Sequence, residues 1–203
     1  MKGRRAQTVL DFWFGRGPPT PAELTEREKL WFGATLNTRL RTRQDRGIVL
    51  AFGKLIKAAA DGDLDHWAGS PNRLLALILL LDQFPRNAFR GRARAFARDH
   101  RAQALTLDGL TTGADAALLP FQRLFFYMPL QHAESAEIQE ESVTAFRRLA
   151  ADAPPEHQEF FAKALASAEQ HRDVIRQFGR FPQRNAALGR SNTAEEAAYI
   201  KKA

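Results

Sequence analysis

His132 and Glu134 stand two residues apart, shortly after the pair Met128-Pro129. A carboxylate that hydrogen-bonds to one imidazole nitrogen fixes the tautomer and leaves the other nitrogen free to take a proton. The spacing therefore indicates a general base at His132 that is oriented by Glu134. The structural alternative is that His132 only caps or links two helices. No other histidine stands at metal-ligand spacing from this pair, so the sequence predicts no metal site.

Asp82 is the second candidate, because it directly follows eight consecutive apolar residues, Leu74 to Leu81. A carboxylate at the end of a buried segment needs a cationic partner. Arginine suits this role, because its planar guanidinium group can bind both carboxylate oxygens. Such a pair either locks a helix corner or orients the guanidinium group toward a ligand. The candidate partners are Arg86, Arg90, Arg180 and Arg184.

One short motif occurs twice, as Phe84-Pro85-Arg86-Asn87 and as Phe181-Pro182-Gln183-Arg184-Asn185. Each copy follows the end of an expected helix and is trailed by a glycine, and helix-end loops often carry functional side chains. The two copies are interpreted either as proline stops with capping residues or as matching corners. In the second interpretation the arginine and asparagine donors of both corners point into one cavity.

The formal net charge is +7, and arginine is far more frequent than lysine, at 23 residues against seven. A basic, arginine-rich surface permits binding of nucleic acid or of anionic substrates. Arg90, Arg94, Arg98 and Arg101 fall at helical spacing and could follow a phosphate backbone. The alternative is a solvated face that is partly paired with Asp99 and further acids. No recognition-helix, RRM or KH signature accompanies the stripe, so a nucleic-acid partner is the weaker interpretation.

Several kinds of chemistry lack their sequence signatures. There is no cysteine, which excludes disulfides, thiolate nucleophiles and cysteine-ligated metals. No phosphate-binding or dinucleotide-binding glycine loop and no G-x-S-x-G turn is found. The segment that begins at Asp61 superficially resembles a calcium loop, but His66 and Asn72 occupy the positions of the required glycine and glutamate. The sequence therefore predicts no cofactor.

The elements that must position these side chains are helices. Capping boxes at Thr20-Pro21 and at Thr193 predict two helix starts, and Ser70-Pro71 predicts a third. Gly62 and Gly179 predict two helix ends. Further helices are expected over 93–107, 118–127, 135–151 and 155–178, with Gly109 beyond the first, Pro129 beyond the second, and Pro85 ending the buried apolar segment.

No segment alternates as a strand does. With 203 residues, we expect one all-α domain over residues 1–203, a bundle of antiparallel helical hairpins with about eight to ten helices. The longest apolar run is Leu74 to Leu81, which is far shorter than the roughly 20 residues of a membrane span. The apolar stretch near the amino terminus is too short for a signal peptide. We therefore expect a cytoplasmic protein.

Four sets of segments together resemble one bacterial family. They are Val9-Leu10-Asp11-Phe12-Trp13-Phe14-Gly15; Leu80 to Asn87 with Arg90-Gly91 and Ala95 to Asp99; Phe125 to Leu130 with His132 and Glu134; and His171-Arg172-Asp173 with Phe178 to Asn185. The chain resembles the family called domain of unknown function 924 over nearly its whole length. The resemblance implies an all-helical fold similar to tetratricopeptide hairpins, and it implies no activity. The sequence departs from the family pattern at Ala133 and at Gln183, where serine and histidine are usual.

From these observations we predict a binding module with a polar pocket for a small anionic ligand, such as a small carboxylate, a phosphate or a peptide carboxyl terminus. A protein partner is a further possibility. The predicted ligand-binding residues are Asp82, Arg86, Asn87, Arg90, Tyr127, Arg180, Arg184 and Asn185. A second hypothesis is an enzyme that uses His132 and Glu134 as its catalytic residues, with the arginines as anion clamps. A third hypothesis is a nucleic-acid-associated basic protein, and a fourth is a purely structural role for the motifs.

Overall fold

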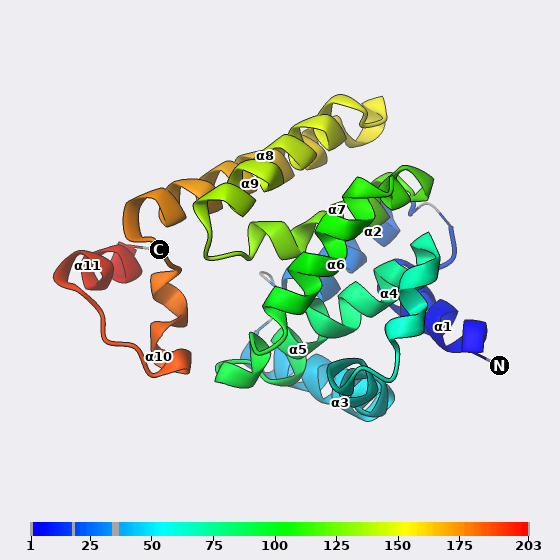
Figure 1. Cartoon of the computed structure of the whole chain (residues 1–203), viewed down its shortest axis with the longest axis horizontal. Helices are drawn as coiled ribbons and strands as arrows, with labels where there is room; N and C mark the ends of the chain where they lie inside the picture. Colours follow the sequence, from blue (N-terminus) through cyan, green and yellow to red (C-terminus); the bar gives the residue numbers. More distant parts are fainter. Residues whose placement is uncertain (1, 18, 34–36, 203) are drawn as a thin grey trace.

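The computed structural model describes residues 2–17, 19–33 and 37–202, and in these residues every regular element is a helix (Figure 1). The α-helices are α1 (Lys2–Phe14), α2 (Pro21–Phe32), α3 (Thr38–Asp61), α4 (Pro71–Leu81), α5 (Gln83–Ala88), α6 (Asp99–Thr111), α7 (Pro120–Gln131), α8 (Ala136–Ala151), α9 (Gln158–Phe178), α10 (Asn185–Leu188) and α11 (Ala194–Lys202). Short 3-10 turns are η1 (Asp65–Gly69), η2 (Ala93–Ala95), η3 (Ala114–Ala117), η4 (Pro155–His157) and η5 (Pro182–Arg184). The predicted all-α class is confirmed.

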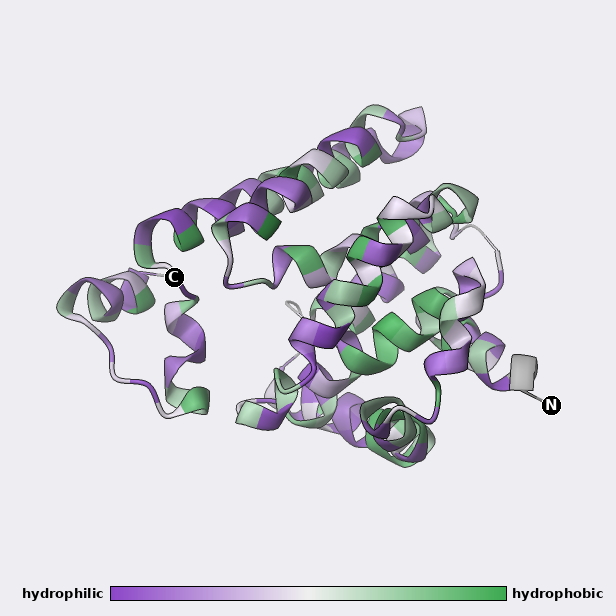
Figure 2. Ribbon diagram, viewed as in Figure 1, coloured by the Kyte–Doolittle hydropathy of each residue, from purple (hydrophilic) through white to green (hydrophobic). Residues whose placement is uncertain are grey.

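Helix α4 lies at the centre, with α1, α3, α6 and α7 packed around it (Figure 1). All eight residues from Leu74 to Leu81 are buried, as expected for a segment that is apolar on every face. Most of this helix has the colour of hydrophobic residues in Figure 2. Burying a leucine side chain contributes about 1.5–3 kcal/mol, so the packing of α4 gives the carboxyl end of this helix a fixed position.

Local signals predict most helix ends correctly. The side chain of Thr20 caps α2 together with Glu23, and Thr193 and Glu196 form the same reciprocal bonds at the start of α11. Gly62 and Gly179 end α3 and α9 with positive φ angles of 93° and 69°, which favour glycine because they lie in the left-handed region.

Two proline positions are exceptions to the prediction. The buried helix ends at Leu81, before Pro85, because the chain turns at Asp82 and Pro85 lies in the first turn of α5, where no amide donor is needed. Helix α7 continues through Pro129 to Gln131 instead of ending before it. Both differences matter for the site, because they set the positions of Asp82 and His132.

The expected helix over 93–107 is also different. The turn η2 and a short connection precede α6, which begins at Asp99 and includes Gly109. A Cβ atom at Gly109 would lie 2.4 Å from Cζ of Phe126 and 3.0 Å from Cδ2 of Leu74. Gly109 is therefore explained by the close packing of α6 against α7 and α4, and not by a helix end.

In the carboxyl-terminal segment, the second Phe-Pro corner, Phe181-Pro182, packs against the core. Helices α8 and α9 run side by side, and the chain then turns through η5 and α10 toward α11 (Figure 1). Phe181 is buried in this turn. This path brings η5 close to the start of α6 and to the connection between α7 and α8, where a buried polar cluster lies. Among the described residues, no helix is long and apolar enough to cross a membrane.

Candidate functional site

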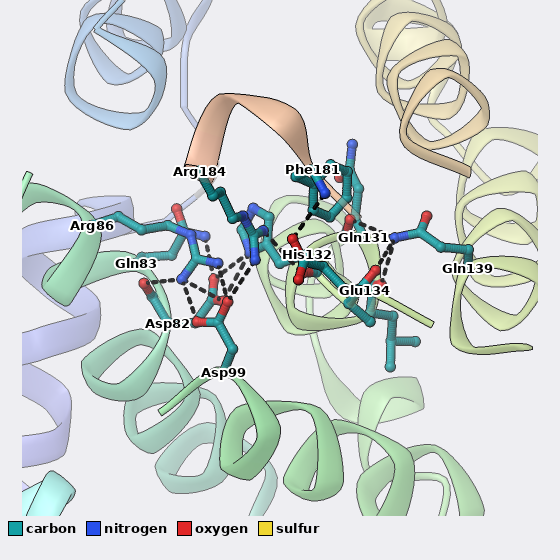
Figure 3. Close-up of polar contacts among 12 residues, drawn as sticks. Asp82, Gln83, Arg86, Asp99, Gln131, His132, Glu134, Gln139, Phe181 and Arg184 are labelled. Atoms are coloured by element: carbon teal, nitrogen blue, oxygen red, sulfur yellow. Dashed lines mark hydrogen bonds and ion pairs between the residues drawn. The ribbon is translucent and has the colours of Figure 1, made fainter. Parts of the chain in front are cut away.

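A cavity of about 440 Å³ opens between the start of α6, the connection from α7 to α8, and η5. Its lining residues are Ala93, Phe96, Ala97, Asp99, His100, Gln103, His132, Glu134, Ser135, Ile138, Arg184 and Leu188. Three predicted site residues, His132, Glu134 and Arg184, therefore border one space. Asp82 contacts His132, and Arg86 contacts Asp99, so both lie next to residues of the cavity wall (Figure 3).

Asp82 is the hydrogen-bond partner of His132. Nδ1 of the imidazole lies 2.8 Å and 3.0 Å from the two carboxylate oxygens of Asp82 (Figure 3). Asp82 is fully buried, and its side chain also accepts a hydrogen bond from Nε2 of Gln83 at 2.6 Å. Burial raises the pKa of Asp82, but Arg86 and His132 outweigh this effect and hold the pKa below its usual range. The carboxylate is therefore ionised and Nδ1 carries the proton.

Arg86 joins two buried carboxylates. It donates to both oxygens of Asp99, at 2.9 Å and 2.8 Å, and Nη1 lies 3.0 Å from Oδ1 of Asp82. Burial lowers the pKa of Arg86, but the two carboxylates raise it by more. The arginine partner that the sequence requires for Asp82 is thus Arg86, one helical turn away. Nη1 also donates to the carbonyl of Asp82 at 2.9 Å.

Arg184 also binds the carboxylate of Asp99. Nη1 donates to Oδ2 of Asp99 at 3.2 Å, and Nη2 donates to the carbonyl of His132 at 2.9 Å. The guanidinium carbon lies 4.8 Å and 4.5 Å from the ring centres of Phe96 and Phe181, an arrangement that favours a cation. Burial and the nearby Arg86 lower the pKa of Arg184 to about 10, so the group stays charged at neutral pH.

Glu134 does not contact the imidazole in the way the sequence predicts. Its carboxylate binds both terminal nitrogens of Arg190, at 2.7 Å and 2.9 Å, and accepts the backbone N–H of Phe181 at 2.8 Å. Burial raises the pKa of Glu134, but Arg190 and this amide lower it by more. Glu134 therefore holds η5 against the α7–α8 connection, and the expected orienting role belongs to Asp82 by geometry.

Three polar groups at the cavity have no protein partner among the described residues. They are the side-chain amide of Gln103, which is only 6% exposed, Nε2 of His132 and Nε of Arg184. None of these atoms belongs to the fully buried polar atoms that lack a partner, so each is open to a solvent molecule or a ligand. These groups offer an acceptor at His132, a donor at Arg184 and both kinds at Gln103.

The remaining predicted residues lie elsewhere. Arg90 binds both oxygens of Asp45 and the side chain of Asn87, beside a separate groove against α3. Arg180 binds both oxygens of Glu196, and Asn185 also contacts this carboxylate, so the two hold α11 in place.

The buried Tyr127 lies outside the cavity lining, and its hydroxyl donates to Asp115 at 2.5 Å.

Of the two predicted matching corners, the structure brings the arginines Arg86 and Arg184 together at Asp99. Neither Asn87 nor Asn185 joins them at the cavity.

The predicted arginine stripe does not form one helical face. Arg90 follows the end of α5, Arg94 lies in η2, Arg98 directly precedes α6, and Arg101 lies in the first turn of α6. Arg90 pairs with Asp45, and Arg101 pairs with Asp65 and donates to the carbonyl of Ala59. In the described parts of the chain, no group of three or more acidic or histidine side chains is arranged to hold a metal ion.

Comparison with known proteins agrees with this architecture. Residues 9–203 match the family described as bacterial protein of unknown function, DUF924. The chain belongs to the DUF924 family. A solved structure of a protein of unknown function from Agrobacterium tumefaciens is similar to it, with 33% sequence identity, complete coverage of both chains and a TM-score of 0.79. No curated protein matches the sequence significantly.

In this DUF924 chain, two residues that border the cavity are absent from the sequence-predicted site. The sequence indicates Asp99 only as a surface partner for the arginine stripe, although it bonds to both corner arginines. Gln103 follows Asp99 by one helical turn on α6, so the two share a face that is buried. Once α6 is known to begin at Asp99, this spacing is the sequence signal that points to Gln103.

Proposed function

We propose that this DUF924 chain binds a small anionic molecule in the cavity between His132, Gln103 and Arg184. The ligand carries a carboxylate or phosphate group that accepts a hydrogen bond from Nε of Arg184. The observation that carries the proposal is that Gln103, His132 and Arg184 line one cavity, and each has a side-chain polar group without a hydrogen-bond partner among the described residues. A cavity of about 440 Å³ is of the size that small-molecule sites have, roughly 300–1,000 Å³.

The contacts around Arg184 support an anion at this position. Two aromatic rings and two hydrogen bonds fix the guanidinium group, so binding a ligand costs little side-chain entropy. The Asp99 carboxylate is already matched by two guanidinium groups. Its negative charge therefore opposes an incoming anion only weakly.

The arginines that pair fully with internal carboxylates carry no part of this proposal. Arg86, Arg90 and Arg180 each bind an aspartate or glutamate through two nitrogens. Their roles are structural, and the anion contact is assigned to Arg184 alone among the predicted arginines.

A thermal-shift series tests the proposal. Succinate, inorganic phosphate and a dipeptide with a free carboxyl terminus are each compared with an uncharged analogue. A ligand present at 100 times its Kd stabilises by about 2.7 kcal/mol. For a chain of this size, that is a rise in Tm of roughly 5–10 °C.

The decisive variant is Gln103→Met, which keeps the volume of the side chain and removes an amide that has no protein partner among the described residues. We expect the fold to be retained and the ligand-induced shift to be lost. Gln170→Met, at an exposed position on α9, is the matched control and keeps the shift. If no anion raises Tm, or if the shift survives in both Gln103→Met and Arg184→Gln, the proposal is wrong.

A further inference from the structure

We propose that the cavity is also a hydrolytic site, in which Nε2 of His132 is the general base and Asp82 is its positioning residue. The substrate is a small ester that carries a carboxylate. This inference rests on the proposed anion-binding function, because Arg184 has to hold the carboxylate for the ester to lie near His132.

The geometry around Nδ1 supports this assignment. Asp82 accepts from Nδ1 through both oxygens and is itself fixed by Gln83 and Arg86. An ionised carboxylate has no proton to donate, so Nδ1 carries the hydrogen and Nε2 keeps its lone pair. Nε2 has no partner among the described residues, and the imidazole borders the cavity. The base therefore has a fixed orientation and a free acceptor.

The charge state of His132 fits the role as well. Burial and Arg86 lower the pKa of His132 below its usual 6.5, although Asp82 acts in the opposite direction. The charged or titratable groups around the ring and its cavity are Asp82 and Arg86 near the α4–α5 turn, Asp99 and His100 on α6, Glu134 on its own connection, Arg184 in η5 and His171 on α9. With this balance the imidazole is neutral at neutral pH, which is the form that can accept a proton.

Three other groups that line the cavity are less suitable as the base. Glu134 is bound by Arg190 and by a backbone amide, which stabilise its carboxylate against protonation. Asp99 is held by two arginines in the same way. The Ser135 hydroxyl accepts the backbone N–H of Ile138 at the start of α8. Among these residues only His132 combines a fixed orientation with a free lone pair.

The proposed reaction is hydrolysis, and water is the only co-reactant. A water molecule bound at Nε2 attacks the ester carbonyl, a C–O bond forms, and the proton of the water moves to Nε2. The imidazolium ion is stabilised by Asp82 while the tetrahedral intermediate exists. When the bond to the alcohol breaks, the leaving oxygen takes the proton from Nε2. The products are a carboxylic acid and an alcohol, and neither an oxidant nor a reductant is needed.

Mono-4-nitrophenyl succinate, which has a free carboxylate, and the uncharged 4-nitrophenyl acetate test the inference on the full chain. We expect kcat/KM to be at least about tenfold higher for the succinate ester, because only this ester can bind Arg184. His132→Gln should lower kcat/KM at least about 100-fold, as for loss of a general base. His66→Gln, on the exposed turn η1, is the matched control and should leave the rate unchanged.

The pH profile and histidine NMR test the role of Asp82. The wild-type rate should be constant above about pH 6.5 and fall at lower pH, as His132 is protonated. Nitrogen-15 spectra should show the neutral ring with its proton on Nδ1. Asp82→Asn should change this tautomer population and lower the rate while the helical CD spectrum is retained. An unchanged tautomer and rate in a folded Asp82→Asn protein would refute the positioning role.

The outcomes separate the two proposals. If succinate raises Tm but neither ester is hydrolysed faster than in buffer, the binding proposal stands and the hydrolytic inference is wrong. If both esters are hydrolysed equally, with loss in His132→Gln and no effect of Arg184→Gln, the general base is confirmed and the anion contact is wrong. Hydrolysis that survives in His132→Gln overturns the inference.

Discussion

Arg86 and Arg184 donate to the same oxygen atom, Oδ2 of Asp99, at 2.8 Å and 3.2 Å (Figure 3). The two arginines occupy equivalent places in the repeated Phe-Pro motif, and one carboxylate at the start of α6 connects them. This relationship ties the central helix α4, through the α5 corner, to the carboxyl-terminal turn η5. The cavity wall therefore depends on a buried charge that neither motif contains.

Removing that shared charge should destabilise the fold. In Asp99→Asn, the positive charges of Arg86 and Arg184 lose the carboxylate that lies between them. Removing one partner of a buried ion pair typically costs about 3–5 kcal/mol. Urea denaturation should show a loss of that order. Asp173→Asn, which removes an exposed partner of Arg172 and Arg176, is the control and should cost under about 1 kcal/mol. Equal stability of the two variants would contradict the bridging role of Asp99.

Stability should fall between pH 6.5 and pH 4 because of His171. Burial lowers the pKa of His171 to about 4, whereas the unfolded chain has the usual value of 6.5. In this range the unfolded state binds the proton and the folded state does not, so the stabilising difference is present above pH 6.5 and is lost as the pH falls. The full loss is about 3 kcal/mol at most.

His171→Gln tests this pH dependence by urea denaturation at pH 7.5 and pH 4.5. The wild-type protein should lose more stability between the two pH values than the variant does. His66→Gln, at an exposed position, should behave like the wild type. His132 acts in the same direction as His171, so the variant should keep a smaller pH dependence. Parallel curves for wild type and His171→Gln would show that His171 is not responsible.

The packing of α6 should make one glycine intolerant of any side chain. Gly109→Ala places a methyl group 2.4 Å from Phe126 and 3.0 Å from Leu74, both buried, so the helices must move apart. We expect a loss of about 1–3 kcal/mol from overpacking. Gly53→Ala, inside α3, meets only Val49 at 4.0 Å and should stabilise by up to about 1 kcal/mol through helix propensity. Thermal denaturation distinguishes the opposite signs, and the same sign for both would contradict the packing argument.

Glu196 should hold α11 against the rest of the molecule. It accepts two hydrogen bonds from Arg180, one from the backbone of Thr193 and one from Asn185. Glu196→Gln removes the charge from this set, so amide hydrogen exchange in α11 should become roughly tenfold faster while α4 is unaffected. Glu195→Gln, at the exposed neighbouring position, should leave exchange unchanged. Uniform acceleration across the chain would indicate global destabilisation instead.

The sequence by itself determined the helical class and most helix ends. Capping boxes and terminal glycines act within one turn, so Thr20, Gly62 and Thr193 are informative without knowledge of the fold. The apolar run Leu74 to Leu81 also predicted a buried central helix. The requirement of Asp82 for an arginine follows from the cost of burying a charge, and it too is a local inference.

Only the tertiary structure decided which side chains meet at the cavity. His132 could be paired with Glu134 or with Asp82 on sequence grounds, and the packing of α7 against α4 selects Asp82. The packing of α5 against α3 places Arg90 and Asn87 beside Asp45, and Gln103 and Arg184 come to line the same cavity. Whether a segment forms a helix depends largely on residues within a few positions of one another. The side-chain pairs at the cavity instead join helices that are far apart in the sequence. They depend on how those helices pack against one another, which the sequence does not state directly.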